Sequence, residues 1–173
     1  MNIIDKIYIP DRYREISISV AKSEVIARYI KSMPKCKESL EIGLAFGASA
    51  CCILNSHSGH HTAIDPHQDL EFYSNIGIQN INKLGFDNRF THINDWSEFA
   101  LPELLKAEKH FDFVFVDGSH SFENIFIDFF YSAQLLNWEG ILIADDASQL
   151  KPVQHVVQHF KTNRDDFVFI EET

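Results

Sequence analysis

The sequence predicts an α/β fold with a doubly wound, mostly parallel sheet and helices on both of its faces. Short apolar segments alternate along the chain with helical patterns, which is typical of parallel sheets. The segment 111–116 is almost continuously apolar, as expected of a central strand that is covered on both faces. Acidic residues or glycines follow several predicted strands, and right-handed crossovers would place them together at one edge of the sheet.

The first helix is predicted from a run of apolar residues that repeat every three or four positions. Ile26, Tyr29, Ile30 and Met33 lie on one face of this helix, and Pro34 ends it. Residues 1–18 before the helix read as an irregular N-terminal lead-in that covers the site or an edge of the sheet. Residues 19–173 are predicted to form a single domain, without an internal repeat or a linker.

The remaining elements alternate between strand and helix. Ser97 is the predicted N-cap of one helix, and Gly85 is the predicted stop of the helix before it. The predicted strands are 39–42, 62–64, 90–93, 111–117, 140–144 and 167–170. Of the predicted helices between them, the first starts near residue 49. The others span about 70–84, 97–105, 122–136 and 153–160.

The composition favours one folded domain and excludes several functional classes. The 173 residues are 45% hydrophobic and 23% charged, which is ordinary for a globular domain and unlike a disordered chain. The net charge is −10 with no basic run, which argues against nucleic-acid binding, and no apolar run is long enough to span a membrane. Cys36, Cys51 and Cys52 fit neither a disulfide framework nor a zinc site, and the N-terminus does not read as a signal peptide, so we expect a cytoplasmic protein.

The residues that follow the predicted strands form the candidate site. Carboxylates gathered at one edge repel one another unless a cation or a hydrogen-bond donor lies among them, so their convergence indicates a ligand. Glycine after the first strand allows a sharp turn and a close approach to that ligand, although a plain strand-to-helix turn explains it equally well. The residues in question are Gly43 and Gly47, Asp65, Asp95 and Trp96, Asp117, and Asp145 with Asp146.

Three segments together resemble class I S-adenosylmethionine-dependent methyltransferases, which have a Rossmann-like fold. Residues 40–49, with the sequence LEIGLAFGAS, resemble the first motif of these enzymes. Residues 111–123, FDFVFVDGSHSFE, resemble the fourth-strand motif of the small-molecule O-methyltransferase branch, which includes macrocin-type and catechol-type enzymes. Residues 140–146, GILIADD, continue the pattern, and the resemblance covers about residues 20 to 160.

The resemblance implies that S-adenosylmethionine is the cofactor. Glu41 and the turn from Gly43 through Ala45 to Gly47 would surround its methionine part. Ser49 would bind the methionine carboxylate, aided by the N–H groups of the following helix N-terminus.

The nucleoside part of the cofactor would meet residues after the second, third and fourth strands. Asp65 would accept hydrogen bonds from the ribose hydroxyls, although an aspartate at this place can instead cap a helix. Asp95 and Trp96 match the adenine-contacting position, where Trp96 would offer a stacking plane or serve as a core or edge aromatic. Asp117 would also contact the cofactor.

The resemblance further implies a divalent metal and a general base. Asp117, Asp145 and Asp146 match the catechol-type ligand set, and hard oxygen ligands suit Mg²⁺ or another divalent cation. In the alternative, only Asp117 touches a ligand and the Asp145–Asp146 pair caps the following helix. His120 is the candidate general base, in a position where catechol enzymes have lysine, or else a loop histidine bonded to backbone. Asp117 would act with it in catalysis.

Two other groups of residues favour structural roles. His57, His60 and His61 lie between a helix and a strand, and their spacing fits a solvated loop rather than a metal site. The phenylalanines at 122, 126, 129 and 130 fit the core better than a substrate cage.

We therefore expect methyl transfer to a hydroxyl of a small molecule, such as a sugar or a diol, with metal assistance. The family sheet has seven strands but only six are predicted here, so the last family strand is either supplied otherwise or absent, and an open edge of this kind favours a homo-oligomer. One alternative is a non-catalytic domain that binds the cofactor or a partner protein. Another is a nicotinamide-dependent oxidoreductase, against which the incomplete G-x-G-x-x-G pattern argues, because position 45 is alanine.

Overall fold

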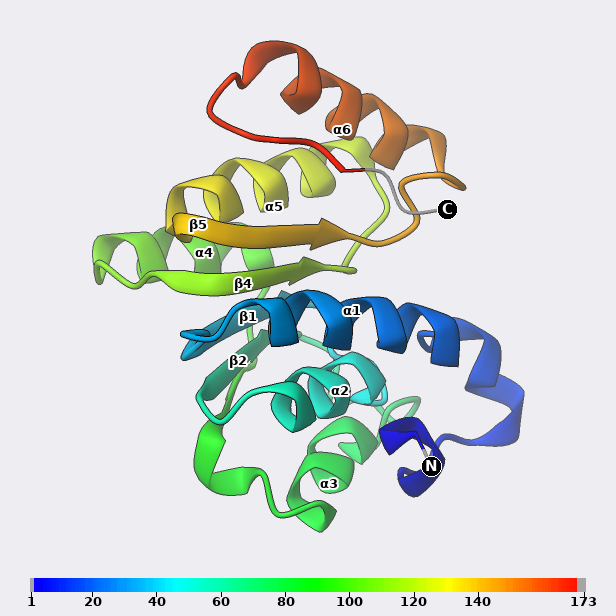
Figure 1. Ribbon diagram of the computed structural model, residues 1–173. Helices are drawn as coiled ribbons and strands as arrows, with labels where there is room; N and C mark the ends of the chain where they lie inside the picture. The colour runs from blue at the N-terminus through cyan, green and yellow to red at the C-terminus, as the bar shows by residue number, and fades with distance from the viewer. Residues whose placement is uncertain (1, 171–173) are drawn as a thin grey trace.

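The computed structural model describes residues 2–170, and within them it contains a five-stranded parallel sheet with the order β3-β2-β1-β4-β5 (Figure 1). The strand order reverses between β1 and β4, which are neighbours in the sheet but distant in the chain, and open parallel sheets bind their ligands at such a switch point. The predicted fold class is confirmed. The strands are β1 (Glu38–Ile42), β2 (His60–Ile64), β3 (Phe90–Ile93), β4 (Phe111–Val116) and β5 (Leu136–Ala144).

Helices cover both faces of the sheet, because the central strands are apolar on both sides (Figure 1). On β4, Phe113 and Phe115 pack in a core with the first helices, whereas Val114 and Val116 pack in a core with the last ones. One layer holds α1 (Val20–Ser32), α2 (Ala48–Ser56) and α3 (Ile76–Lys83). The other layer holds α4 (Ser97–Lys106), α5 (Phe122–Leu135) and α6 (Lys151–Asn163).

Two helix starts differ from the prediction. The helix expected from about residue 70 begins at Ile76, because Ser74 and Asn75 have left-handed backbone angles (φ 46° and 57°) that a right-handed helix cannot contain. Ser97 is the first residue of α4 rather than its cap; Trp96 occupies the cap position and makes no side-chain capping bond.

The strand predicted at 167–170 is wrong. These residues form no regular element and are not paired with the sheet, whose β5 edge stays open within the described part of the chain. Val168 is 90% exposed and Ile170 is 68% exposed, while Phe169 packs against the core of α5 and α6. The segment is therefore attached to the core by the Phe169 ring and not by hydrogen bonds to a neighbouring strand.

The N-terminal segment contains two short 3₁₀ helices, η1 (Ile3–Lys6) and η2 (Asp11–Ile16), and a third, η3 (Asp87–Arg89), precedes β3. Buried Asn80 of α3 ties this segment down: its side chain accepts a hydrogen bond from the Tyr8 N–H at 2.8 Å and donates one to the Tyr8 carbonyl at 2.8 Å. In Figure 1 the segment lies on the side to which the arrowheads of β4 and β5 point. No helix among the described residues has the length and apolarity that a bilayer crossing needs.

Candidate functional site

The carboxyl ends of the strands meet along one edge of the sheet. Ile42 pairs with Ile64 and Val116, Ile64 pairs with Ile93, and Val116 pairs with Ala144. The ladder continues one residue further through the N–H groups that follow four of these strands. The residues that come next therefore stand side by side at this edge: Gly43, Asp65, Asn94, Asp117 and Asp145.

The turn after β1 approaches the turn after β4 closely. Gly43 has φ of 92°, and a Cβ at this position would collide with the backbone carbonyl of Asp117, so only glycine fits. Gly47 has φ of 77° and a Cβ there would lie 2.9 Å from the carbonyl oxygen of Gly77. Ala45 also has a left-handed angle, φ 44°, which costs an L-residue about 1–2 kcal/mol. This turn is thus held in a strained, narrow form.

Asp65 fixes the turn after β1. Its Oδ2 accepts hydrogen bonds from the N–H groups of Leu44 at 2.9 Å and Ala45 at 3.0 Å. Its Oδ1 accepts one from the N–H of His67 at 2.7 Å, and the side chain is buried. Gln68, also buried, donates to the carbonyl of Ala45 at 2.8 Å. The carboxylate therefore has a structural role at its own turn, and its contact with a ribose stays a prediction.

A cleft with a volume of about 270 Å³ opens between this turn, the N-terminal segment and the turn after β4. Tyr73 lines the cleft and was not predicted, because it lies in a non-helical turn where the sequence favoured a helix. Burial raises the pKa of the Tyr73 hydroxyl, and the carboxylates of Asp65 and Asp117 raise it further. The lining residues of the predicted site are Gly43, Ala45, Ser49, Asp117 and His120, joined by Ile16, Ser17 and Ile18 of the N-terminal segment.

Glu41, Asp95 and Trp96 are among the predicted residues that do not line the cleft. Glu41 is fully buried, with Oε1 3.5 Å from Nε2 of His61. Asp95 is exposed and accepts the N–H of Trp96 at 2.8 Å. The Trp96 ring is 45% exposed and stands edge-on to the ring of His67, with centroids 5.0 Å apart, so it stays available as a stacking plane near the Asp65 turn.

The histidine-rich segment after α2 is not the solvated loop that its composition suggested. His61 is fully buried in β2, and its Nδ1 lies 2.9 Å from Ser39 Oγ. Nε2 of His57 lies 2.9 Å from the same oxygen, and Nδ1 of His57 accepts the N–H of Gly59 at 3.0 Å. These contacts form a partly buried polar chain between β1, β2 and the segment before β2, and no spacing rule in the sequence reveals it.

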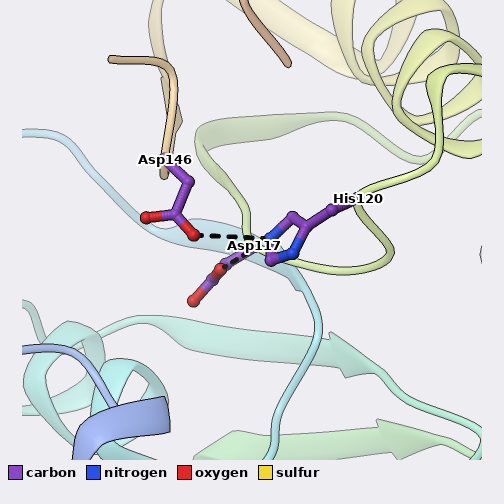
Figure 2. A group of neighbouring side chains, drawn as sticks. All are labelled: Asp117, His120 and Asp146. Atoms are coloured by element: carbon purple, nitrogen blue, oxygen red, sulfur yellow. Dashed lines mark ion pairs between the residues drawn. The ribbon is translucent and has the colours of Figure 1, made fainter. Parts of the chain in front are cut away.

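The side chains of Asp117, His120 and Asp146 converge beside the cleft (Figure 2). Nε2 of His120 lies 3.9 Å from Oδ1 of Asp117 and 3.6 Å from Oδ2 of Asp146. One ligand atom from each residue falls within 4.8 Å of the others, which is close enough for all three to hold one cation. Figure 2 shows the imidazole pointing toward both carboxylates.

The charges of this cluster perturb one another. Burial is the main cause that raises the pKa of Asp117 to about 6. His120 lowers this pKa, whereas the neighbouring carboxylates of Asp145 and Asp146 raise it further. The hydrogen-bonding interaction with Asp117 raises the pKa of His120, although burial acts in the opposite direction. The cluster thus favours bound cations and protons.

Asp145 is held by a residue that the sequence did not indicate. Nζ of Lys22, in the first turns of α1, lies 2.6 Å from Oδ1 of Asp145 and 3.1 Å from Oδ1 of Asp146. Lys22 precedes Asp146 by 124 positions, so neither motif nor periodicity could connect them. The acid pair does not cap α6, whose cap residue is Leu150.

The donor set fits a divalent cation, because carboxylate oxygens and an imidazole nitrogen are common ligands of Mg²⁺, Mn²⁺ and related ions. Asp117 and Asp146 belong both to the predicted metal set and to the observed cluster. His120 stands in the cluster where Asp145 was predicted, and Asp145 is instead paired with Lys22 of α1.

Comparison with known proteins shows what the chain is similar to. The sequence model of a family described as a methyltransferase domain matches residues 40–147. A protein of Arabidopsis thaliana, whose name places it with the caffeoyl-CoA O-methyltransferases, is 30% identical over 109 residues, which are 62% of this chain and 45% of that protein. This chain therefore spans less than half the length of that relative.

Two solved structures share the fold. The O-methyltransferase from Bacillus cereus in complex with SAH superposes with a TM-score of 0.70 at 16% identity, over 87% of this chain and 71% of the other. The O-methyltransferase TomG from Streptomyces achromogenes, involved in tomaymycin synthesis and solved with SAM, has a TM-score of 0.70 at 17% identity, over 86% and 70%.

Proposed function

The chain belongs to the methyltransferase-domain family, and we propose that it transfers a methyl group from S-adenosylmethionine to a hydroxyl oxygen of a small molecule. One observation carries this proposal: the turn after β1 and two members of the acidic cluster, Asp117 and His120, line the same cleft. A cofactor seated on the turn would thus present its methyl group near a base. The names of the relatives support an oxygen acceptor.

For cofactor binding, the chain offers a preformed cradle. The N-terminus of α2 begins just after Gly47, and its free N–H groups with the Ser49 hydroxyl suit the methionine carboxylate. A carboxylate has about four lone-pair positions; three of those on Asp65 accept backbone N–H groups, and the fourth accepts only a long hydrogen bond, 3.4 Å, from Gln68, which a ribose hydroxyl would replace. Trp96 would provide the adenine platform and Asp95 an acceptor.

For the chemistry, His120 would act as general base. The hydroxyl oxygen attacks the methyl carbon in line with the sulfur; the O–CH₃ bond forms, the S–CH₃ bond breaks, and the proton passes to Nε2 of His120. Asp117 and Asp146 would stabilise the resulting imidazolium, since both carboxylates face that nitrogen. Holding the reacting atoms in line contributes about 7–11 kcal/mol to lowering the barrier in favourable cases.

We further propose that Asp117, Asp146 and Asp145 or His120 hold a divalent cation. When bound, such a cation lowers the pKa of an acceptor hydroxyl. A sugar or a vicinal diol is the acceptor class that best suits these polar groups. Ser17, Ser49 and His120 at the cleft wall can hydrogen-bond additional hydroxyl groups.

Calorimetric titration with S-adenosylhomocysteine and a radiolabelled methyl-transfer assay over sugars and diols would test the proposal. His120→Ala should keep S-adenosylhomocysteine binding but lower turnover about 100- to 10,000-fold. His155→Ala, which removes an exposed histidine on α6, is the matched control. Binding without turnover in any acceptor would indicate a non-catalytic domain, and binding of NADH instead would indicate an oxidoreductase.

A further inference from the structure

Lys22 places a positive charge inside the acidic cluster. Its Nζ contacts Oδ1 of both Asp145 and Asp146, while the other oxygen of Asp146 faces His120. Asp146 therefore bridges an ammonium group and an imidazole. Three carboxylates, with Asp117, share this small volume, and Lys22 is their one close fixed cation among the described residues.

The ammonium group of Lys22 contacts Oδ1 of both Asp145 and Asp146, so a metal ion cannot bind between these two acids while Lys22 is there. A divalent cation bound to Asp146 and Asp145 would lie where the ammonium group now lies, within a few ångströms of a like charge. The Lys22 side chain is 39% exposed on a flexible four-carbon stem, so it can move into solvent without opening the core.

We propose that Lys22 and a divalent cation compete for Asp145 and Asp146. Without metal, Lys22 is the counter-ion that holds the two acids together. When metal binds, Lys22 withdraws, Asp145 becomes a ligand, and His120 stays available as a base. This inference rests on the metal site of the proposed function.

A structural ion pair between α1 and β5 would have the opposite consequence. If Lys22 only positioned the two acids, its removal would misplace them and weaken metal binding. If Lys22 competes, its removal leaves the acids uncompensated and strengthens metal binding. The sign of the change therefore separates the two roles.

The proposal can be tested by measuring, with electron paramagnetic resonance, how tightly Mn²⁺ alone binds to the Lys22→Met variant. We expect Mn²⁺ to bind this variant at least about tenfold more tightly than the unchanged protein. Lys31→Met removes the same charge from the exposed last turn of α1 and should change the affinity less than about twofold. Lys22→Arg, which keeps the charge, should resemble the unchanged protein. Equal or weaker binding by Lys22→Met, or no Mn²⁺ binding by any of these proteins, would overturn the proposal.

A second measurement uses the unchanged protein, so it does not depend on whether a variant folds. In protein labelled with ¹³C-lysine, the Lys22 Cε resonance should shift on titration with Mg²⁺ as the ammonium group leaves the acids. A resonance that stays in place while Mg²⁺ binds would contradict the competition. S-adenosylhomocysteine binding is measured separately, so its failure would count against the proposed function and not against this inference.

Discussion

At the edge of the sheet where the strands end, the acidic side chains after β1 and β2 (the first half of this edge) and those after β4 and β5 (the second half) are stabilised in different ways. At β1 and β2, the buried carboxylate of Asp65 accepts three backbone N–H groups at 2.7–3.0 Å. At β4 and β5, the carboxylates of Asp117 and Asp146 face His120 only at 3.9 and 3.6 Å. The first half is thus organised by the backbone, and the second half by mobile charges.

This difference separates a rigid binding half from an adaptable chemical half. Backbone donors cannot leave, so the turn after β1 keeps its shape with or without a ligand. The acids at β4 and β5 depend on Lys22, protons or metal for compensation, so their arrangement responds to what binds.

Among these predictions, replacing Asp65 should have the largest effect on stability, because it removes the acceptor that holds the turn after β1. Hydrogen bonds to a charged group contribute about 1.5–3 kcal/mol each, so Asp65→Ala should lower the free energy of unfolding by about 4 kcal/mol. It should also abolish S-adenosylhomocysteine binding. Urea denaturation and calorimetry would measure the two effects.

Asp69→Ala is the matched control for Asp65→Ala, because Asp69 is an exposed carboxylate that accepts only a side-chain bond from Asn94. We expect it to change the stability by less than about 1 kcal/mol. Similar losses in the two variants would show that Asp65 does not organise its turn.

Adding metal should sharpen the contrast, because the acids of the second half are compensated by the movable side chain of Lys22 and not by three backbone donors. Mn²⁺ at 100 times its dissociation constant should raise the free energy of unfolding by about 2.7 kcal/mol, and chelation should reverse the gain. Asp146→Asn should remove this stabilisation, since Asp146 joins both cationic partners. A thermal-melting series with and without chelator would measure it, and an unchanged response in Asp146→Asn would place the metal elsewhere.

The sequence predicted the parts of this site that depend on strand order and missed those that depend on loop geometry. Parallel strands in the observed order bring Gly43, Asp65, Asp117 and Asp145 to one edge whatever the loops do. Periodicity and apolar runs locate the strands and helices along the chain, and their alternation indicates a parallel sheet, which is why the fold class was predictable.

The remaining features arise from contacts between distant segments. Lys22 meets Asp145 because α1 packs over the sheet, and no local pattern encodes that contact. The hydrogen bonds that Asp65 accepts from the turn after β1 depend on the left-handed backbone angle of Ala45. An alanine in the sequence does not predict such an angle. The unpaired segment 167–170 shows the converse, since a strand-like pattern without a partner forms no strand.

A second uncompensated carboxylate lies beneath the β4 turn, and removing its charge should stabilise the protein. Asp128 of α5 is fully buried, neither of its oxygens has a hydrogen-bond partner among the described residues, and Oδ2 lies near Gly118. Burial raises the pKa of Asp128 to about 6, although the nearby Ser97 hydroxyl acts in the opposite direction, and Glu98 raises it further. Asp128→Asn should therefore raise the free energy of unfolding at pH 7 by about 2 kcal/mol.

The sign of the pH dependence follows from the raised pKa. The folded protein holds the Asp128 proton more tightly than the unfolded chain, so the charged form is a cost above pH 6 that shrinks as the pH falls toward 3.8. The advantage of Asp128→Asn should shrink over the same range in urea melts. Asp87→Asn, at an exposed position, should give no such trend, and a constant advantage at every pH would contradict the buried charge.

Relaxing the turn after β1 should have the smallest effect and test whether its rigidity matters for binding. Ala45→Gly removes the cost of φ 44° and should raise the free energy of unfolding by up to about 1 kcal/mol, reduced by the greater freedom of glycine in the unfolded chain. The same freedom should loosen the cradle and weaken S-adenosylhomocysteine binding a few-fold. Ala48→Gly, in the first turn of α2, should instead lower stability, because its helical backbone carries no such strain. If Ala45→Gly bound the ligand more tightly, the strained turn would oppose binding, and the division into a rigid and an adaptable half would fail.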